Sequence, residues 1–254
     1  MLLAVDIGNT NITIGVFNGD SLDATWRVST DSSRTSDEYG LQLSHMLETN
    51  DSIDGEITDV VICSVVPPLT PTFENLCRRY FDLTPLVVHA GVKTGIKVLY
   101  DSPRDVGADR IVDAIAAIRL HGGPAIIVDL GTATVFDAVT ESGEYLGGAI
   151  APGMEVSGDA LFRATSQLRR VELSSPSTAI GKNTPHSIQS GLVLGYSELV
   201  KGMILRFKKE LGHHSKVIAT GGLATVIEKE VSSFDLVDPN LTLKGLRIVY
   251  ELNL

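Results

Sequence analysis

The sequence predicts an α/β protein built from two duplicated domains, each with a mixed β-sheet and flanking helices. The first observation behind this prediction is an internal repeat, in which VDIGNTNITIGV near the N-terminus resembles VDLGTATVFDAV in the middle of the chain. Asp6 matches Asp129 and Val16 matches Val139 at the same offset, which is close to half the chain length. A repeat of that length indicates two similar domains rather than a solenoid of short repeats.

The second observation is that each half opens with three short strands. In the first half, apolar runs within 2–20 predict a hairpin, and 22–30 predicts a third strand. In the second half, the corresponding segments are 125–143 and 145–153. Glycine, asparagine and aspartate separate the runs, which is typical of the tight turns that join antiparallel strands.

Helix and strand patterns then alternate in both halves. Segment 37–49 predicts a helix, and 57–81 predicts a strand, a proline break and a second helix, before a short strand within 85–90. In the second half, apolar residues at helical spacing predict a long helix within 186–211, and 213–234 predicts a strand, a glycine break and a helix. Each half therefore has the predicted order strand, strand, strand, helix, strand, helix.

A further helix is predicted within 109–123, between the two halves. Isoleucines recur there at helical spacing, and a pair of glycines ends the segment. We expect this helix to join the domains, so the predicted domains are 1–118 and 119–254.

Composition narrows the class of protein. A chain of 254 residues with 43% apolar and 20% charged residues suits a soluble globular protein with a substantial core. The formal net charge of −10 disfavours non-specific binding to nucleic acid, which needs clustered positive charge. We expect a cytoplasmic protein with no membrane partner, because no apolar stretch approaches a membrane span and no signal peptide is recognisable.

The two cysteines indicate neither a zinc site nor a disulfide framework. Cys63 lies in an apolar run and Cys77 in a helical pattern, and neither is near a cluster of histidines. We expect two reduced, partly buried thiols.

The strand ends of the repeat predict a site for phosphates. A glycine turn lets backbone N–H groups approach phosphate oxygens, and threonine and asparagine side chains add donors. Asp6 and Asp129 would repel those oxygens unless a cation lay between, so both are candidate cation ligands. The alternative is that both are ordinary turn residues. Their repetition in two similar domains favours the cation role.

Other nucleotide motifs are absent from the sequence. AIGKNT contains Gly-Lys but lacks the earlier glycine and the final hydroxyl residue of a P-loop, and no G-x-G-x-x-G follows a strand. The stretch VIATGGLATV leaves two interpretations open. Its paired glycines would let a base or ribose pass close to the backbone, or they form a plain turn between a strand and a helix.

Four motifs together resemble a known family. They are DIGNTNIT (6–13), GADR (107–110), VDLGTATV (128–135), and GKNTP followed by QSG (181–191). They resemble the superfamily that contains acetate kinases, sugar kinases and actin, and more closely the type III pantothenate kinases. The resemblance spans essentially the whole chain. It implies two actin-like (ribonuclease H-like) domains, each with a mixed five-stranded sheet, and an ATP cleft between them.

The resemblance also implies an activity, namely ATP-dependent phosphorylation of pantothenate to 4′-phosphopantothenate, the first step toward coenzyme A. It implies Mg²⁺ and a monovalent cation, K⁺ or NH₄⁺, and a homodimer. The implied ATP-binding residues are Asp6, Ile7, Gly8, Asn9, Thr10, Asn11, Ile12, Thr13 and Thr132. The implied pantothenate-binding residues are Tyr100, Gly107, Ala108, Asp109, Arg110 and Thr184. Asp109 would be the general base, Asp6 would face Mg²⁺ through the phosphates, and Asp129 would bind the monovalent cation.

Several of these residues also have simpler interpretations. Asp109 suits the N-cap of a helix, and Thr184 suits another cap. Tyr100 lies in a Pro/Gly/Asp-rich loop, where an aromatic side chain can be a structural anchor. Arg110 suits a solvated surface, although a guanidinium also pairs well with the carboxylate of pantothenate.

Two other activities remain open at this stage. One is a related phosphotransferase or phosphohydrolase with a different small substrate. The other is a nucleotide-dependent regulatory protein. The segment 162–173 has no assigned role.

Overall fold

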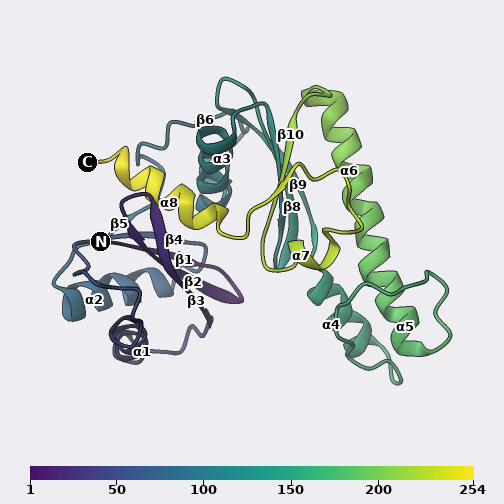
Figure 1. Ribbon diagram of the computed structural model, residues 1–254, viewed down its shortest axis with the longest axis horizontal. Helices are drawn as coiled ribbons and strands as arrows, with labels where there is room; N and C mark the ends of the chain where they lie inside the picture. The colour runs from purple at the N-terminus through teal and green to yellow at the C-terminus, as the bar shows by residue number, and fades with distance from the viewer. The chain divides into compact units, whose positions relative to one another are not determined.

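Two β-sheets form the centres of two compact units (Figure 1). The computed structural model describes residues 1–254. Unit 1 consists of Met1–Gly95, Ser102–Ala116 and Thr242–Leu254, and unit 2 consists of Ile96–Asp101 and Ala117–Leu241. Each unit is described by itself below.

The sheet of unit 1 has the five strands that the sequence predicts. They are β1 (Leu2–Ile7), β2 (Asn11–Asn18), β3 (Ser21–Ser29), β4 (Asp59–Ser64) and β5 (Leu86–Val87), in the spatial order β3-β2-β1-β4-β5. The first three are antiparallel, and β4 runs parallel to β1, so the sheet is mixed as predicted.

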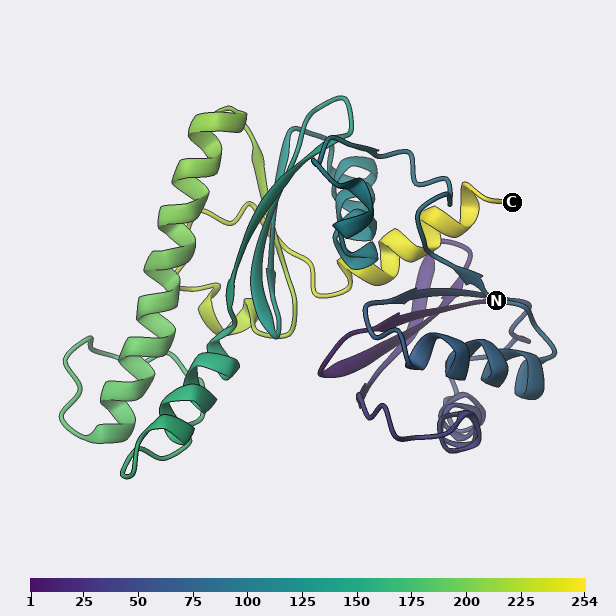
Figure 2. The same cartoon turned by 180° about the vertical axis from the view of Figure 1, so that it is seen from behind.

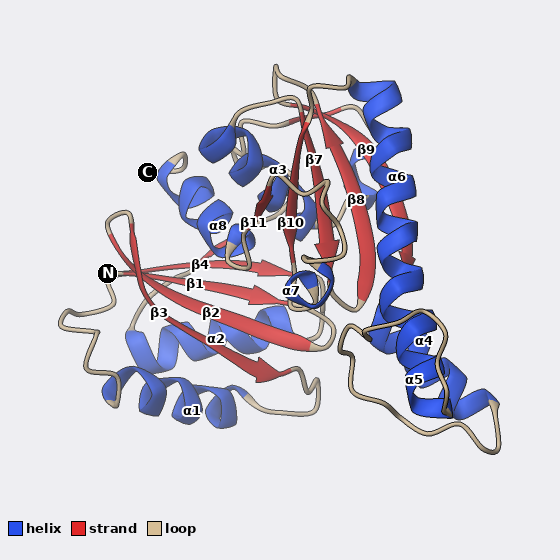
Figure 3. Ribbon diagram, turned by 45° about the vertical axis from the view of Figure 1, so that its right-hand side comes forward, coloured by secondary structure: helices blue, strands red, loops and turns tan.

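Two helices of unit 1 lie together on one face of this sheet (Figure 3). They are α1 (Ser36–Glu48) and α2 (Leu69–Phe81), both within predicted helical segments. Alternate residues of the strands point toward them, so that Leu3, Val5 and Ile7 are fully buried. These side chains form one apolar core with Phe73 and Leu76 of α2.

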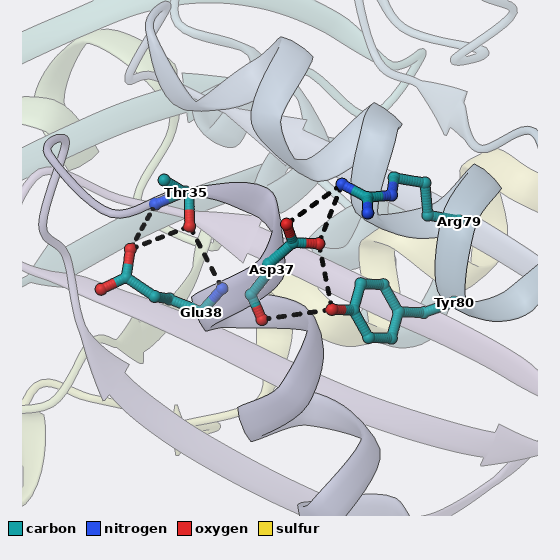
Figure 4. Close-up of polar contacts among 5 residues, drawn as sticks. All are labelled: Thr35, Asp37, Glu38, Arg79 and Tyr80. Atoms are coloured by element: carbon teal, nitrogen blue, oxygen red, sulfur yellow. Dashed lines mark hydrogen bonds and ion pairs between the residues drawn. The ribbon is translucent and has the colours of Figure 1, made fainter.

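The ends of α1 and α2 carry specific polar contacts (Figure 4). Thr35 and Glu38 form a reciprocal capping box, which satisfies backbone N–H groups at the start of α1. Asp37 accepts a hydrogen bond from Tyr80 Oη at 3.1 Å and pairs with Arg79 at 2.9 Å. The ion pair is exposed and contributes little, so the two helices depend mainly on their apolar contact.

The sheet of unit 2 repeats this arrangement and adds one strand. Its spatial order is β11-β10-β7-β8-β9-β6. The strands are β7 (Ala125–Leu130), β8 (Ala133–Val139), β9 (Glu144–Pro152), β10 (Lys216–Thr220), β11 (Leu236–Val237) and β6 (Lys97–Val98). The prediction of five strands per sheet is therefore wrong here by one. The sixth strand, β6, is a two-residue strand paired parallel to the outer edge of β9.

The helices of unit 2 are α4 (Met154–Ala164), α5 (Thr184–Gln189), α6 (Gly195–Leu211) and α7 (Ala224–Ile227). The sequence predicts a helix within 186–211 and another within 213–234 of unit 2, but not α4. A π-helical turn, Ser190–Leu194, connects α5 to α6, so the predicted long helix is present with one widened turn. Figure 2 shows α6 along one face of the sheet, where Val200 and Ile204 are buried in the core of the unit.

Strand register confirms the duplication and corrects one detail of the predicted alignment. Leu2 pairs with Phe17 in unit 1, and its counterpart Ala125 pairs with Val139 in unit 2. Phe17, rather than Val16, is therefore equivalent to Val139, because the turn of the second hairpin is one residue shorter. Both units also have a β-bulge at the same place, after Val16 in unit 1 and after its true counterpart Ala138 in unit 2.

Helix α3 (Ala108–His121) joins the two units, as the sequence predicts for 109–123. Gly122 follows it with φ +78°, a conformation that favours glycine after a helix. The boundary between the two units within α3 lies between Ala116 and Ala117. Two other segments belong to the unit from the other half of the chain: α8 (Leu241–Glu251) belongs almost wholly to unit 1, and 96–101 belongs to unit 2. The domains 1–118 and 119–254 remain a prediction.

None of the helices combines the length and the apolar composition needed to cross a membrane. Both cysteines are free thiols, and both are fully buried rather than partly buried as expected.

Burial predicts that neither thiol reacts in the folded protein. It holds the pKa of Cys63 well above its usual range and raises the pKa of Cys77 to about 12. At pH 8 a thiol with a pKa of about 12 carries a thiolate fraction of about 10⁻⁴. We expect no labelling by iodoacetamide at pH 8 in the native protein and labelling of both thiols after unfolding in guanidinium. Rapid labelling of the native protein would contradict this.

Candidate active site

The turn between β1 and β2 in unit 1 is held in one shape by hydrogen bonds. Gly8 N donates to Asn11 O at 3.0 Å, Thr30 Oγ1 donates to Gly8 O at 2.6 Å, and Thr30 N donates to Thr10 O at 3.0 Å. A Cβ on Gly8 would lie only 3.0 Å from Asn11 O. The end of β3 therefore fixes a turn that a glycine fits best.

The residues of this turn differ in what they can offer to a ligand. Ile7 and Ile12 are fully buried and pair with each other, so only their backbone groups are available. Asn9 and Thr10 are exposed at the tip, and Asn11 is half-buried. The turn therefore offers polar side chains on a frame that two core isoleucines hold.

Asp6 lies one residue before the end of β1 and is half-buried. Its direct neighbour on β2 is Thr13, also half-buried, so the carboxylate and the hydroxyl lie on the same face of the sheet. On the other side, Asp6 pairs with Cys63 of β4. These neighbours place the carboxylate between a hydroxyl and an uncharged thiol.

Several acidic residues of unit 1 lie near the thiol of Cys63. This thiol is fully buried, and its pKa is raised first by burial and then by the negative charges of Asp6, Asp109 and Asp113. Unit 1 therefore brings Asp6 and Asp109 into electrostatic reach of the same buried atom, although they are far apart in the sequence. Sequence patterns did not single out Cys63 for this position.

Asp109 is the second residue of α3, not its N-cap, so the simpler interpretation of this residue is wrong. Its Oδ1 accepts a hydrogen bond from the backbone N–H of Arg110 at 2.8 Å. Burial raises the pKa of the Asp109 carboxyl, while that hydrogen bond and the charge of Arg110 act in the opposite direction. A Cβ on Gly107 would collide with Asp109 Oδ1, so the glycine makes room for the carboxylate.

Asp129 in unit 2 occupies the place that Asp6 has in unit 1. It is half-buried one residue before the end of β7, and Gly131 N donates to Ala133 O at 3.0 Å in the turn that follows. Asp129 pairs with Val135 on β8 and with Thr220 on β10.

Two glycine turns approach the Asp129 carboxylate. A Cβ on Gly131 would be 3.6 Å from its Oδ1, and a Cβ on Gly221 would collide with the same oxygen. Gly221 also has φ +87°, which disfavours any other residue. The paired glycines after β10 therefore do form a turn between a strand and a helix, and that turn lies against Asp129.

Thr132 is exposed at the tip of the β7–β8 turn. Its carbonyl accepts a hydrogen bond from Gly153 N at 3.0 Å, and a Cβ on Gly153 would collide with that carbonyl. Gly153 is the residue just before α4, so the start of α4 lies against this turn.

Tyr100 follows β6 and is 38% exposed. Its ring centre lies 6.4 Å from that of the buried Tyr145, with the planes tilted by 52°. It is therefore partly anchored and partly available to a ligand.

Thr184 is the first residue of α5, but it is not the cap. Asn183 is the N-cap, and its side chain accepts from His186 N at 2.9 Å. Thr184 lines an open cavity of about 640 Å³ together with Lys182, Ser187 and apolar residues of α4 and the π turn. The alternative interpretation of Thr184 as the helix cap is wrong, and the residue is exposed at the cavity.

The segment 162–173, to which the sequence gave no role, borders a second cavity of about 470 Å³. Arg170 lies there, paired with Asp159 of α4 at 3.0 Å and stacked over Phe162 at 5.3 Å. The segment is therefore tied back onto α4.

No group of three or more His, Cys, Asp or Glu side chains is arranged to hold a metal ion. A single half-buried carboxylate such as Asp6, beside a turn rich in backbone donors, fits Mg²⁺ held mainly by phosphates and water. The described site residues thus form two sets, one in unit 1 around Asp6 and Asp109, and one in unit 2 around Asp129.

The structure resembles solved structures with which it shares little sequence. One is described as a Baf-family transcriptional activator from Campylobacter jejuni (TM-score 0.62, 18% identity, 99% of this chain and 98% of that chain). Another is the activator of 2-hydroxyisocaproyl-CoA dehydratase from Clostridium difficile with bound ADPNP (TM-score 0.53, 14% identity, 99% and 95%). A third is the ROK hexokinase from Thermus thermophilus (TM-score 0.51, 12% identity, 98% and 97%). These similarities confirm the predicted actin-like fold class.

Sequence comparison is more specific. Residues 2–206 match the family model for type III pantothenate kinase. Curated proteins of that name are 50% identical over 252 residues in Dehalococcoides mccartyi (99% of this chain and 96% of the relative) and 51% identical over 253 residues in Moorella thermoacetica (100% of each). The relative from Myxococcus xanthus is 52% identical over 254 residues, with 100% of this chain and 99% of the relative covered. The chain therefore belongs to the type III pantothenate kinase family.

Proposed function

We propose that this chain carries out the reaction for which its family is named. It transfers the γ-phosphoryl group of ATP to the primary hydroxyl of pantothenate and forms 4′-phosphopantothenate, the first step of coenzyme A biosynthesis. The observation that supports this most strongly is identity near 50% over essentially the full length of curated type III pantothenate kinases. A kinase of this family uses ATP, and Mg²⁺ is its expected metal ion.

The β1–β2 turn is our proposed phosphate site. Its backbone N–H groups and the hydroxyls of Thr10 and Thr13 donate to phosphate oxygens. Asp6 orients water or Mg²⁺ at the phosphates, and the metal ion supplies charge neutralisation when it is bound. The exposed Asn9 contributes at the tip, and the buried Ile7 and Ile12 contribute only backbone.

Asp109 is the proposed general base. Its carboxylate accepts the proton of the pantothenate hydroxyl as the phosphoryl group is transferred. Its partly buried position raises its pKa, which makes it a stronger base than a solvated aspartate. Gly107 and Ala108 bring the backbone close to the substrate, and Arg110 pairs with the pantothenate carboxylate.

Unit 2 supplies the remaining proposed contacts. Asp129 binds a monovalent cation, K⁺ or NH₄⁺, and Thr132 adds a phosphate contact. Tyr100 and Thr184 contact pantothenate, which agrees with their exposure. We also propose a homodimer in the cytoplasm that does not bind nucleic acid, in keeping with two free thiols and the net charge of −10.

The direct test is a coupled assay with ATP, Mg²⁺ and pantothenate, run with and without K⁺. We expect phosphopantothenate by mass spectrometry and faster turnover with K⁺. ATP hydrolysis that does not depend on pantothenate would favour a phosphohydrolase. Nucleotide binding without turnover would favour a regulatory role.

The first prediction concerns the proposed base. Asp109→Asn keeps the size of the side chain but cannot accept the proton, so we expect kcat to fall by about 10²- to 10⁴-fold. In the wild-type protein, kcat/KM for pantothenate should fall as the pH drops through the raised pKa of Asp109, because the protonated carboxyl is not a base. That acid limb should be absent from the variant. Near-normal turnover in a folded variant would show that Asp109 is not the base.

A second prediction concerns the neighbouring arginine. Arg110→Lys keeps the positive charge beside Asp109 but loses bidentate pairing with a carboxylate. We expect the KM for pantothenate to rise about tenfold, which corresponds to about 1.4 kcal/mol, and the KM for ATP to change little. A larger effect on ATP than on pantothenate would place Arg110 at the nucleotide instead.

A third prediction concerns the cation site. Gly221→Ala forces a Cβ against Asp129 Oδ1, and to within 2.6 Å of Leu130 O, at φ +87°. We expect half-maximal activation to need about tenfold more K⁺, equivalent to about 1.4 kcal/mol. The control is Gly202→Ala in α6, where a Cβ meets nothing within 4 Å. This control should leave K⁺ activation unchanged and stabilise the helix by about 0.5–1 kcal/mol. An unchanged K⁺ titration in Gly221→Ala would refute the assignment.

A further inference from the structure

A buried carboxylate and a buried phenol form a hydrogen bond inside unit 2. Tyr145 Oη donates to Asp137 Oδ1 at 2.7 Å, and the two residues are 0% and 2% exposed. Burying a charged group is unfavourable unless it is well hydrogen-bonded, so a pair of this kind needs a reason other than packing.

The bulge between β8 and β9 brings the two side chains together. Asp137 pairs with Gly148, but across the bulge Val139 pairs with Tyr145, so Leu146 has no partner on β8. Asp137 and Val139 point to the same face because they are two residues apart on one strand. Tyr145, opposite Val139, therefore lies diagonally across from Asp137 on that face.

Unit 1 shows that the fold does not require a polar pair at this place. Its own bulge pairs Gly15 with Thr25 and Phe17 with Leu22. By strand register, Gly15 is the counterpart of Asp137, and Leu22 is the counterpart of Tyr145. A Cβ on Gly15 would be 2.9 Å from Leu243 Cδ1 and 3.0 Å from Leu22 Cδ1, so apolar side chains fill this place in unit 1.

The units differ in what lies beside this contact. In unit 1 the sheet ends at β3, whereas in unit 2 the corresponding strand β9 carries β6 on its outer edge. Val98 of β6 pairs with Tyr145, and Leu99 N donates to Tyr145 O at 2.9 Å. The polar pair therefore lies where the added strand is attached.

Tyr100 lies directly against this attachment. Its ring packs on the Tyr145 ring at 6.4 Å, and a Cβ on Gly147 would be 3.1 Å from it. Gly147 has φ +113°, a conformation that glycine adopts at no steric cost. The Tyr100 ring thus packs against the Tyr145 ring and against a position that has no side chain.

We propose that Asp137 and Tyr145 are positioning residues that hold Tyr100 in its orientation toward pantothenate. The hydrogen bond fixes the Tyr145 ring, the ring supports Tyr100, and the backbone of Tyr145 anchors Leu99. This inference rests on the proposed role of Tyr100 in binding pantothenate. Its structural part, the anchoring of 97–100, does not depend on that role.

The test is Tyr145→Phe, which keeps the ring and removes only the hydroxyl. We expect the KM for pantothenate to rise about three- to tenfold, as the loss of one buried hydrogen bond allows, while kcat and the KM for ATP stay within about twofold. Hydrogen exchange of the Leu99 amide should become faster. The matched control is Tyr80→Phe, which removes another phenol-to-carboxylate bond, to Asp37 at 3.1 Å, in unit 1. It should change neither measurement.

A double variant separates positioning from general destabilisation. If Tyr145 acts through Tyr100, Tyr145→Phe should raise the KM for pantothenate little further in a Tyr100→Ala background. Additive effects on KM, or an unchanged Leu99 exchange rate in Tyr145→Phe, would overturn the proposal. If the wild-type protein does not phosphorylate pantothenate, the proposed function fails, and the exchange rates alone then decide whether the pair anchors 97–100.

Discussion

Each unit has a partly buried carboxylate one residue before the end of its first strand. This carboxylate is the constraint around which the unit is arranged. Withdrawing such a group from water costs several kcal/mol unless charge or hydrogen bonds compensate it. In the parallel register, the neighbour of Asp6 is Cys63 and the neighbour of Asp129 is Thr220, and neither brings a formal charge. Burial keeps the Cys63 thiol protonated, so it adds no repulsion. A cation at either carboxylate would therefore meet no formal positive charge from these two neighbours, which agrees with the proposed roles of both aspartates.

The duplication makes the differences between the units informative. Strand order, register and bulge position agree in both, so these features belong to the fold. The positions that differ carry the distinct chemistry. Gly15 and Leu22 in unit 1 correspond to Asp137 and Tyr145 in unit 2, and only unit 2 has β6 at that edge. The internal repeat thus allows equivalent positions to be compared within one chain. Unit 1 shows which residues packing alone requires at these positions.

Much of the fold was predictable from the sequence, because turn chemistry and hydrophobic period are local properties. The glycine turn after Asp6 and its copy after Asp129 were predicted this way, as was most of the order of elements, although α4, β11 and α8 were not predicted. The length of the second turn was not predicted either, because one residue fewer scarcely alters the pattern, and so Val139 was matched to Val16 rather than to Phe17. The two-residue β6 and the grouping of α8 with unit 1 depend on long-range contacts. Roles such as that of Asp109 came from family resemblance, since spacing alone allowed a helix cap.

The surroundings of Asp109 explain how its carboxylate can be more basic than a solvated one. Burial alone would favour the protonated form, and a fully compensated carboxylate would be too weak a base. At Asp109 the Arg110 N–H and guanidinium oppose burial without cancelling it, so the pKa is raised. Gly107 admits the carboxylate into this position because a Cβ would collide with it. The basicity of Asp109, the proposed catalytic group, is therefore set by the short motif Gly107–Arg110. Gly107 leaves space for the carboxylate, and Arg110 limits the rise in its pKa that burial causes.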